Sequence, residues 1–153
     1  MAEIVTWCVS KRAIFKHLQI LCCLIAVLFL IDGRAQWKPY SVIMFADVIL
    51  AVLVILTLVL YFSQVQKKNQ GLWTKIELAF NFLATILSLI FTIILIYDYI
   101  KMNDGQFGHH RFLPSNRIGV PGWMNRIIIV AVSQVVQTIV FLMSLVWAHK
   151  YGV

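Results

Sequence analysis

The chain has 153 residues, of which 61% are hydrophobic and only 12% are charged, and its formal net charge is +7. Soluble globular domains carry about 25% charged residues, so this composition excludes an ordinary soluble domain. The thirteen Lys and Arg residues stand mainly at the ends of apolar stretches and form no basic run, so nucleic acid is not an expected partner.

Four apolar stretches occupy most of the chain, and we expect each to cross a membrane as a helix: residues 16–31, 42–62, 76–97 and 127–147. An α-helix rises about 1.5 Å per residue, so about 20 apolar residues cover the ~30 Å hydrocarbon core. Lipid offers the backbone no hydrogen-bond partners, and therefore each span must be helical. The sequence predicts an all-α fold, a single integral membrane domain over residues 1–153 packed as an antiparallel four-helix bundle.

The segment before the first span lacks the pattern of a cleavable signal peptide, because it carries Glu3 and no small-residue cleavage site follows the apolar run. We expect the first span to be retained. Cys8 lies close to the membrane beside Lys11 and Arg12, which fits either a palmitoylation site or a free interfacial thiol. Neither external connection contains a cysteine, so no loop disulfide is expected.

The three connections differ in length and composition. Residues 32–41 form a tight link, and residues 63–75 are polar and basic. Residues 98–126 form the one sizeable loop, whose glycines and prolines predict irregular structure. We expect this loop to make contacts outside the membrane, on the non-cytoplasmic side.

Charge and aromatic residues predict the orientation. Four spans place both termini on one side, together with the 63–75 loop, which holds Lys67, Lys68 and Lys75 and no acid before Glu77. The positive-inside rule then puts both termini in the cytoplasm, in the plasma membrane or secretory-pathway vesicles. The same three lysines are candidates for contacts with anionic lipid, with topology determination alone as the alternative. All ten Trp and Tyr residues fit two interfacial belts.

Polar residues inside the spans follow helical spacing and predict the packed faces. The third span carries Glu77, Asn81, Thr85, Ser88 and Thr92. The fourth carries Ser133, Gln137 and Ser144, with Gln134 beside them. The second and first spans offer Asp47, Ala51, Val54, Gln19, Cys22, Cys23 and Ala26. These faces are expected to meet inside the bundle or, for the third helix, to bind a partner.

Asp47 and Glu77 are the acids nearest the membrane. A proton or cation site is one interpretation of such residues. The sequence favours a structural one, because each acid lies within about two turns of its span's start, where headgroups and loop bases neutralise it. Lys75 and Lys150 are the expected partners of Glu77, and no acid is expected near mid-membrane.

The histidines allow two cofactor hypotheses. His17 and His149 lie near the cytoplasmic ends of their helices, where a bridging haem is conceivable but interfacial packing is favoured. His109 and His110 would suit a metal or pH-sensing site. No carboxylate beyond Asp104 is evident to complete a ligand set, so an exposed or partner-contacting loop is favoured and no cofactor is expected.

The layout resembles the MARVEL-domain proteins, which include the MAL-like, chemokine-like-factor-like and physin groups. The similarity lies in the four spans, the small size, the opening Lys-His-Leu-Gln-Ile-Leu of residues 16–21 and the Trp-Thr-Lys-Ile-Glu of residues 73–77. It implies a non-enzymatic protein that organises membrane or partner proteins in membrane apposition, vesicle traffic or cell junctions. The implied partners are membrane lipids, other membrane proteins or further copies of the chain.

Two other functions use the same architecture. The chain would serve as an auxiliary subunit of a channel, receptor or transporter if the third-helix stripe faced a partner. Small four-span enzymes of glutathione and eicosanoid metabolism share the size and basic charge. They carry an Arg-x-x-x-Asn-x-x-Glu pattern at the end of the second helix, which residues 61–68 lack, so no enzymatic activity is expected.

Overall fold

The computed structural model describes residues 10–152, and this part of the chain contains four long helices and no strand. They are α2 (Lys11–Leu30), α3 (Lys38–Phe62), α4 (Gln70–Asn103) and α5 (Gly119–Tyr151). Two short 3-10 helices, η1 (Ile31–Gly33) and η2 (Val65–Lys68), lie in the connections. All four long helices are apolar and long enough to cross a membrane. The predicted all-α fold is confirmed, and the chain is a multi-pass membrane protein.

Each helix extends beyond the span that the sequence predicts. With 34 and 33 residues, α4 and α5 are each about 50 Å long. Such a helix is longer than a hydrocarbon core of about 30 Å, so it must tilt or extend beyond the core. Because α4 ends at Asn103 and α5 begins at Gly119, the prediction of irregular structure over residues 98–126 is wrong at both ends, and only residues 104–118 of that segment are non-helical. Pro121 lies in the first turn of α5, where its missing N–H costs no hydrogen bond.

The helices begin and end at residues suited to those positions. The side chains of Ser10 and Asn69 accept hydrogen bonds from the N–H groups of Ala13 and Leu72, which caps α2 and α4. Pro39 stands in the first turn of α3. Gly152, with φ +68°, ends α5.

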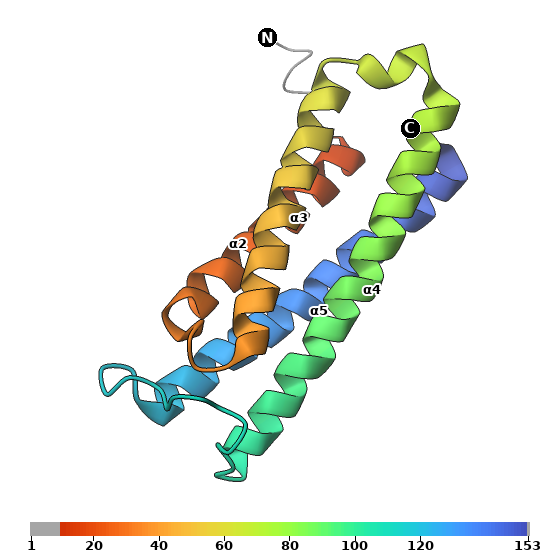
Figure 1. Ribbon diagram of the computed structural model, residues 1–153. Coiled ribbons are helices and arrows are strands. Elements are labelled where there is room, and N and C mark those ends of the chain that lie inside the picture. The colour runs from red at the N-terminus through yellow and green to blue at the C-terminus, as the bar shows by residue number, and fades with distance from the viewer. Residues whose placement is uncertain (1–9, 153) are drawn as a thin grey trace.

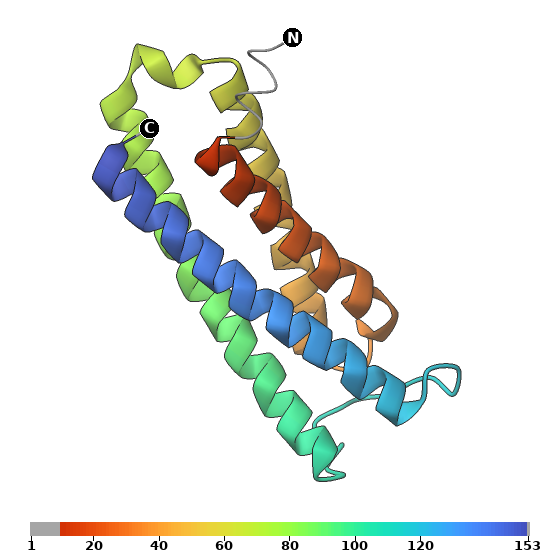
Figure 2. The same cartoon turned by 180° about the vertical axis from the view of Figure 1, so that it is seen from behind.

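Successive helices run antiparallel, and the two longest, α4 and α5, lie side by side along most of their length (Figure 1). In the view from behind, α2 lies against α5 (Figure 2). α3 packs mainly on α2 and has few close approaches to α4, from which it diverges toward the η2 end. The two described ends of the chain meet there, because the Arg12 guanidinium donates to the Gly152 carbonyl at 2.7 Å.

A heptad pattern explains the pairing of α4 with α5. Apart from Thr92, the buried residues of α4 follow alternating spacings of four and three: 77, 81, 84, 88, 91, 95, 98 and 102. Those of α5 include the matching series 123, 127, 130, 134, 137, 141, 144 and 148. Such a repeat keeps one seam of each helix facing its neighbour along its whole length. The seam contains both apolar and polar positions, and the polar ones contribute to the interior sites described next.

Candidate functional site

Polar side chains gather in three layers inside the bundle, which we name by position. The η2-end layer contains Lys16, Gln19, Glu77, Asn81 and Ser144. The central layer contains Asp47, Ser88, Gln134 and Gln137. The loop-end layer contains Tyr40, Asp98, His109, His110 and Trp123. Each layer draws its residues from at least three elements of the fold.

The η2-end layer is built on a buried ion pair. Lys16 Nζ lies 2.5 Å from Glu77 Oε1, and the two side chains are 1% and 7% exposed. Asn81 donates to the same carboxylate oxygen at 2.9 Å. Gln19 Nε2 donates to the Ser144 hydroxyl at 2.9 Å and to the side-chain oxygen Asn81 Oδ1 at 3.5 Å. The layer therefore ties α2, α4 and α5 together through side chains.

The partner of Glu77 differs from the sequence expectation, which named Lys75 and Lys150. Both of those lysines are exposed, whereas Lys16 is inside the bundle. Lys16 shares a face of α2 with Gln19 and Cys23, at spacings of three and seven residues. That spacing is the signal that places Lys16 in the interior although it opens the first apolar span.

The central layer surrounds Asp47 with amides. Gln134 Nε2 donates to Asp47 Oδ2 at 2.6 Å, and Gln137 Nε2 donates to Oδ1 at 3.1 Å. Gln137 Nε2 also lies 3.2 Å from the Ser88 hydroxyl. Asp47 and both glutamines are fully buried. The carboxylate is thus held by hydrogen bonds rather than by a cationic side chain.

Asp47 lies farther from the start of its helix than the predicted span 42–62 implies. Gln134, Gln137 and Ser88 all lie near the middle of their long helices. Asp47 itself is close to the middle of α3, because that helix begins at Lys38 rather than at residue 42. Inside the bundle, the amide groups of the two glutamines hold its carboxylate.

The loop-end layer converges on Asp98. His109 Nε2 and His110 Nε2 lie 2.8 Å and 2.7 Å from Asp98 Oδ1. The Tyr40 hydroxyl donates to the other oxygen, Oδ2, and Trp123 Nε1 donates to the Tyr40 hydroxyl at 3.2 Å. Asp98 and the His110 side chain are fully buried, and the His109 side chain is 19% exposed.

The two histidine side chains are therefore mostly buried, although much of the surrounding loop is exposed to solvent. The carboxylate that joins them is Asp98 and not Asp104. Asp98 continues the heptad of buried residues on α4, so it points into the bundle and toward the returning loop. The spacing of Asp98 from the other buried residues of α4 predicts its inward position only if the helix is known to continue past residue 97.

The packing beneath this layer depends on a glycine. A Cβ atom at Gly33 would lie 1.9 Å from Trp123 Cη2, so the Trp123 ring occupies the space that a side chain would need. The close approach of η1 to α5 lets the ring reach Tyr40.

The predicted packing face lies inside the bundle with one partial exception. Glu77, Asn81, Ser88, Thr92, Ser133, Gln137 and Ser144 are buried, and Thr85 is half-buried. Thr85 and Thr92 donate to carbonyls of their own helix, and Ser133 donates to the Cys22 carbonyl of α2 at 3.2 Å. Cys22 and Cys23 are buried free thiols, and Cys8 lies outside the described residues.

His17 and His149 are exposed and make no contact with each other in the described part of the chain. The His17 Nδ1 atom lies 2.6 Å from the Ala13 carbonyl of its own helix. The structure therefore does not bring the two rings together as axial ligands of one haem.

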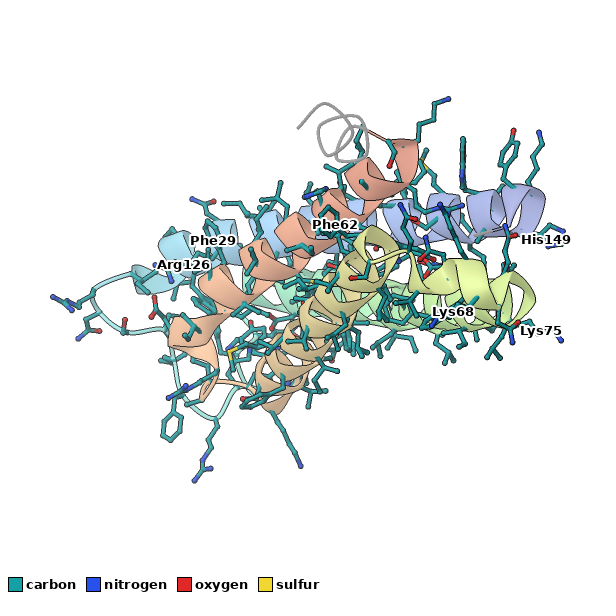
Figure 3. The ribbon with its side chains drawn as sticks, turned by 90° about the horizontal axis from the view of Figure 1, so that it is seen from above. Phe29, Phe62, Lys68, Lys75, Arg126 and His149 are labelled. Atoms are coloured by element: carbon teal, nitrogen blue, oxygen red, sulfur yellow. The ribbon has the colours of Figure 1, made fainter. Side chains whose placement is uncertain are left out.

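The η2 end of the molecule is basic. Lys67, Lys68 and Lys75 are exposed there, and Lys68, Lys75 and His149 lie at the end opposite Arg126 (Figure 3). Beside them, an apolar groove of about 510 Å³ runs between α2 and α5 and is lined by Phe15, Leu142, Met143, Val146 and Trp147. Lys11 and Lys150 also line this groove, and Lys11 Nζ lies 5.4 Å from the Trp147 ring centre.

No family model, no curated protein and no solved structure matches this chain.

Proposed function

We propose that this protein is a non-enzymatic four-span membrane protein that organises membrane lipids and partner membrane proteins. One observation carries the proposal: the polar side chains of the spans pair with one another inside the chain, and the outer helix faces are left to large apolar side chains. Such a surface is suited to packing against lipid and other apolar helices. The resemblance to MARVEL-domain proteins implies a role of the same kind.

The outer surface offers little hydrogen-bonding capacity of its own. Thr57, Thr85 and Thr138 are half-buried, and each donates to a carbonyl of its own helix at 2.7–2.8 Å. Lateral contacts with such a face must rest on shape and van der Waals packing, as in most helix association within membranes.

α3 is the best candidate for a contact with another membrane protein, because α2 is the one long helix whose backbone approaches it closely along its length. Its outward side chains include Phe45 and Ile49, which are 61% and 59% exposed. Between α3 and α4, an apolar groove of about 240 Å³ is lined by Val42, Ile43, Phe91 and Ile94, with Lys38 and Pro39 at its end. A helix from a partner or from a second copy would fill it.

The basic end supports an interaction with anionic lipid and a cytoplasmic location of both termini. Lysines near an anionic leaflet gain about 1 kcal/mol each from the surface potential. The groove between α2 and α5 accommodates an acyl chain, while Lys11 and Lys150 stand where a phosphate headgroup would lie. Glu77, the acid of this end within residues 10–152, is neutralised by Lys16 and does not oppose this charge.

The auxiliary-subunit hypothesis loses its first argument, because Asn81, Ser88 and Thr92 face the bundle interior and not a partner. Such a subunit would have to dock through the apolar face of α3.

The test is photo-crosslinking in native membranes. A photoreactive phenylalanine analogue replaces Phe45 or Ile49 on α3, and Val132 on the outer face of α5 is the matched control position. The proposal predicts discrete protein adducts from the α3 positions and mainly lipid adducts from position 132. Lipid adducts alone from all three positions, with no enrichment of anionic lipid, would remove its support.

A further inference from the structure

We infer that Asp98, His109 and His110 form a binding site for a divalent transition-metal ion of the zinc type. The inference is independent of the proposed function. The three residues each offer one ligand atom, and these atoms lie within 4.8 Å of one another. Two imidazole nitrogens approach the same carboxylate oxygen, at 2.7 Å and 2.8 Å. The three ligand atoms are therefore already gathered within reach of a single ion.

The donor set suits zinc. Two histidines and one carboxylate are the protein ligands of many open zinc sites, in which the fourth position holds water or another ligand. With bond lengths of about 2.0–2.1 Å, a tetrahedral ion holds its ligand atoms about 3.3 Å apart. The distances from the two Nε2 atoms to Asp98 Oδ1 must therefore increase by about 0.5 Å to admit the ion. His109 and His110 stand on the non-helical segment 104–118, so the chain can shift there without breaking a helix.

The surroundings of Asp98 leave Oδ1 for the ion and hold the rest of the carboxylate in place. Tyr40 donates to Oδ2, and Trp123 in turn donates to Tyr40. Carboxylates that bind metals are commonly oriented by such outer hydrogen bonds. Tyr40 on α3 and Trp123 on α5 thus fix the orientation of the Asp98 carboxylate, which belongs to α4.

The two imidazole rings are also held. The Trp37 ring stacks on His110 with centres 5.9 Å apart and meets His109 edge-on at 5.2 Å. His110 Nδ1 is buried and has no hydrogen-bond partner. The His110 ring is therefore held in the interior by Trp37 and by the contact of its Nε2 atom with Asp98 Oδ1, and an ion would bind between these two atoms. The partly exposed His109 leaves the route by which an ion and its fourth ligand enter.

Such an ion would link the end of α4 to the returning loop and keep one coordination position open. That position would accept water or a side chain of another molecule. The predicted consequence for this chain is a zinc-dependent increase in thermal stability.

The experiment uses the full-length protein in lipid nanodiscs, with any histidine tag removed. The bound zinc is measured after equilibrium dialysis against micromolar zinc. We expect one ion per chain, and at least a tenfold loss of affinity in His109→Gln and Asp98→Asn. His149→Gln is the matched control, because His149 is exposed and remote from the cluster, and it should bind zinc like the natural chain. Tyr40→Phe should weaken binding by about 10–100-fold.

A second readout keeps the inference testable if a variant fails to fold. Cobalt(II) added to the unsubstituted protein should give the intense visible absorption of a four-coordinate ion. The inference is overturned if cobalt retains the weak absorption of its hexa-aqua ion. It is also overturned if zinc binding is absent, or if folded His109→Gln binds as tightly as the natural chain. Equal losses in His149→Gln and His109→Gln would likewise reject it, because they would indicate non-specific binding to surface histidines.

Discussion

Lys16 on α2 and Glu77 on α4 form a buried ion pair between two helices whose backbones have few close approaches. The pair lies among Gln19, Asn81 and Ser144, which complete a polar network at the η2 end. Two opposite charges inside a membrane protein are tolerable only together, because either one alone would be uncompensated in a medium of low dielectric constant.

Replacing Glu77 with Gln should therefore destabilise the protein severely. Removing one partner of a buried ion pair costs about 3–5 kcal/mol, because the Lys16 ammonium would stay buried and unpaired. The free energy of unfolding in a mild detergent measures the loss.

The double variant Lys16→Met/Glu77→Gln is the control for this prediction, since it removes both charges. It should recover most of the stability that Glu77→Gln loses, and the coupling follows from a double-mutant cycle. A double variant no more stable than Glu77→Gln would show that the pair is not the source of the loss.

Asp47 gives a second prediction, at the centre of the bundle. Asp47→Leu removes the acceptor of the Gln134 amide and leaves the Gln137 amide with Ser88 alone, so it should cost about 1–3 kcal/mol. Asp47→Asn keeps an acceptor oxygen and should cost less. Thermal unfolding in detergent compares the two, with the lipid-facing Val48→Leu as the neutral reference. The account of Asp47 as a hydrogen-bonded structural residue fails if Asn is as damaging as Leu.

Gly33 gives a third prediction, because a methyl group there would overlap the Trp123 ring. Gly33→Ala should displace the ring, break its bond to Tyr40 and cost about 1–3 kcal/mol, the usual penalty of overpacking. Gly71→Ala is the matched control, since a Cβ atom at position 71 meets nothing within 4 Å. The change should appear in the tryptophan fluorescence and melting temperature of the first variant only. Equal melting temperatures would contradict the prediction.

The basic end gives a fourth prediction. Replacing Lys67, Lys68 and Lys75 together with Gln should reduce the preference for phosphatidylserine over phosphatidylcholine, because each lysine contributes about 1 kcal/mol near an anionic surface. Spin-labelled lipids in nanodiscs measure that preference, and added salt should reduce it in the natural chain.

The reference for this fourth prediction is the triple change of Arg34, Lys38 and Lys101 to Gln at the opposite end, which should leave the preference largely intact. Equal losses in the two triple variants would show that overall charge and not the η2 end determines the lipid preference.

The sequence allowed the number of helices and the direction of their polar faces to be predicted, because span length and helical spacing are local properties of the chain. Asn81 and Ser88 on α4 and Gln137 on α5 are buried at the spacing that indicated a packed face. The spacing of residues along one helix does not predict the register between two helices. The pairing of Glu77 with Lys16, and of Asp47 with Gln134, depends on how far one helix slides along another.

The loop-end layer was missed for a different reason. Asp98 follows the third apolar span and looks like the first residue of a loop, but α4 continues to Asn103 and holds it on the buried face. Hydropathy marks the part of a helix that prefers lipid and not the point where the helix ends. His109 and His110 then return to Asp98 from a segment whose path no periodicity describes.

The measurement that tests the central claim most directly is purification from native membranes in a mild detergent, followed by identification of the proteins and lipids that remain bound. The account predicts recovery of the chain with anionic lipid and with further copies or several membrane proteins in variable ratio. A single larger membrane protein bound at a fixed ratio would contradict it and would make the chain a subunit of that protein.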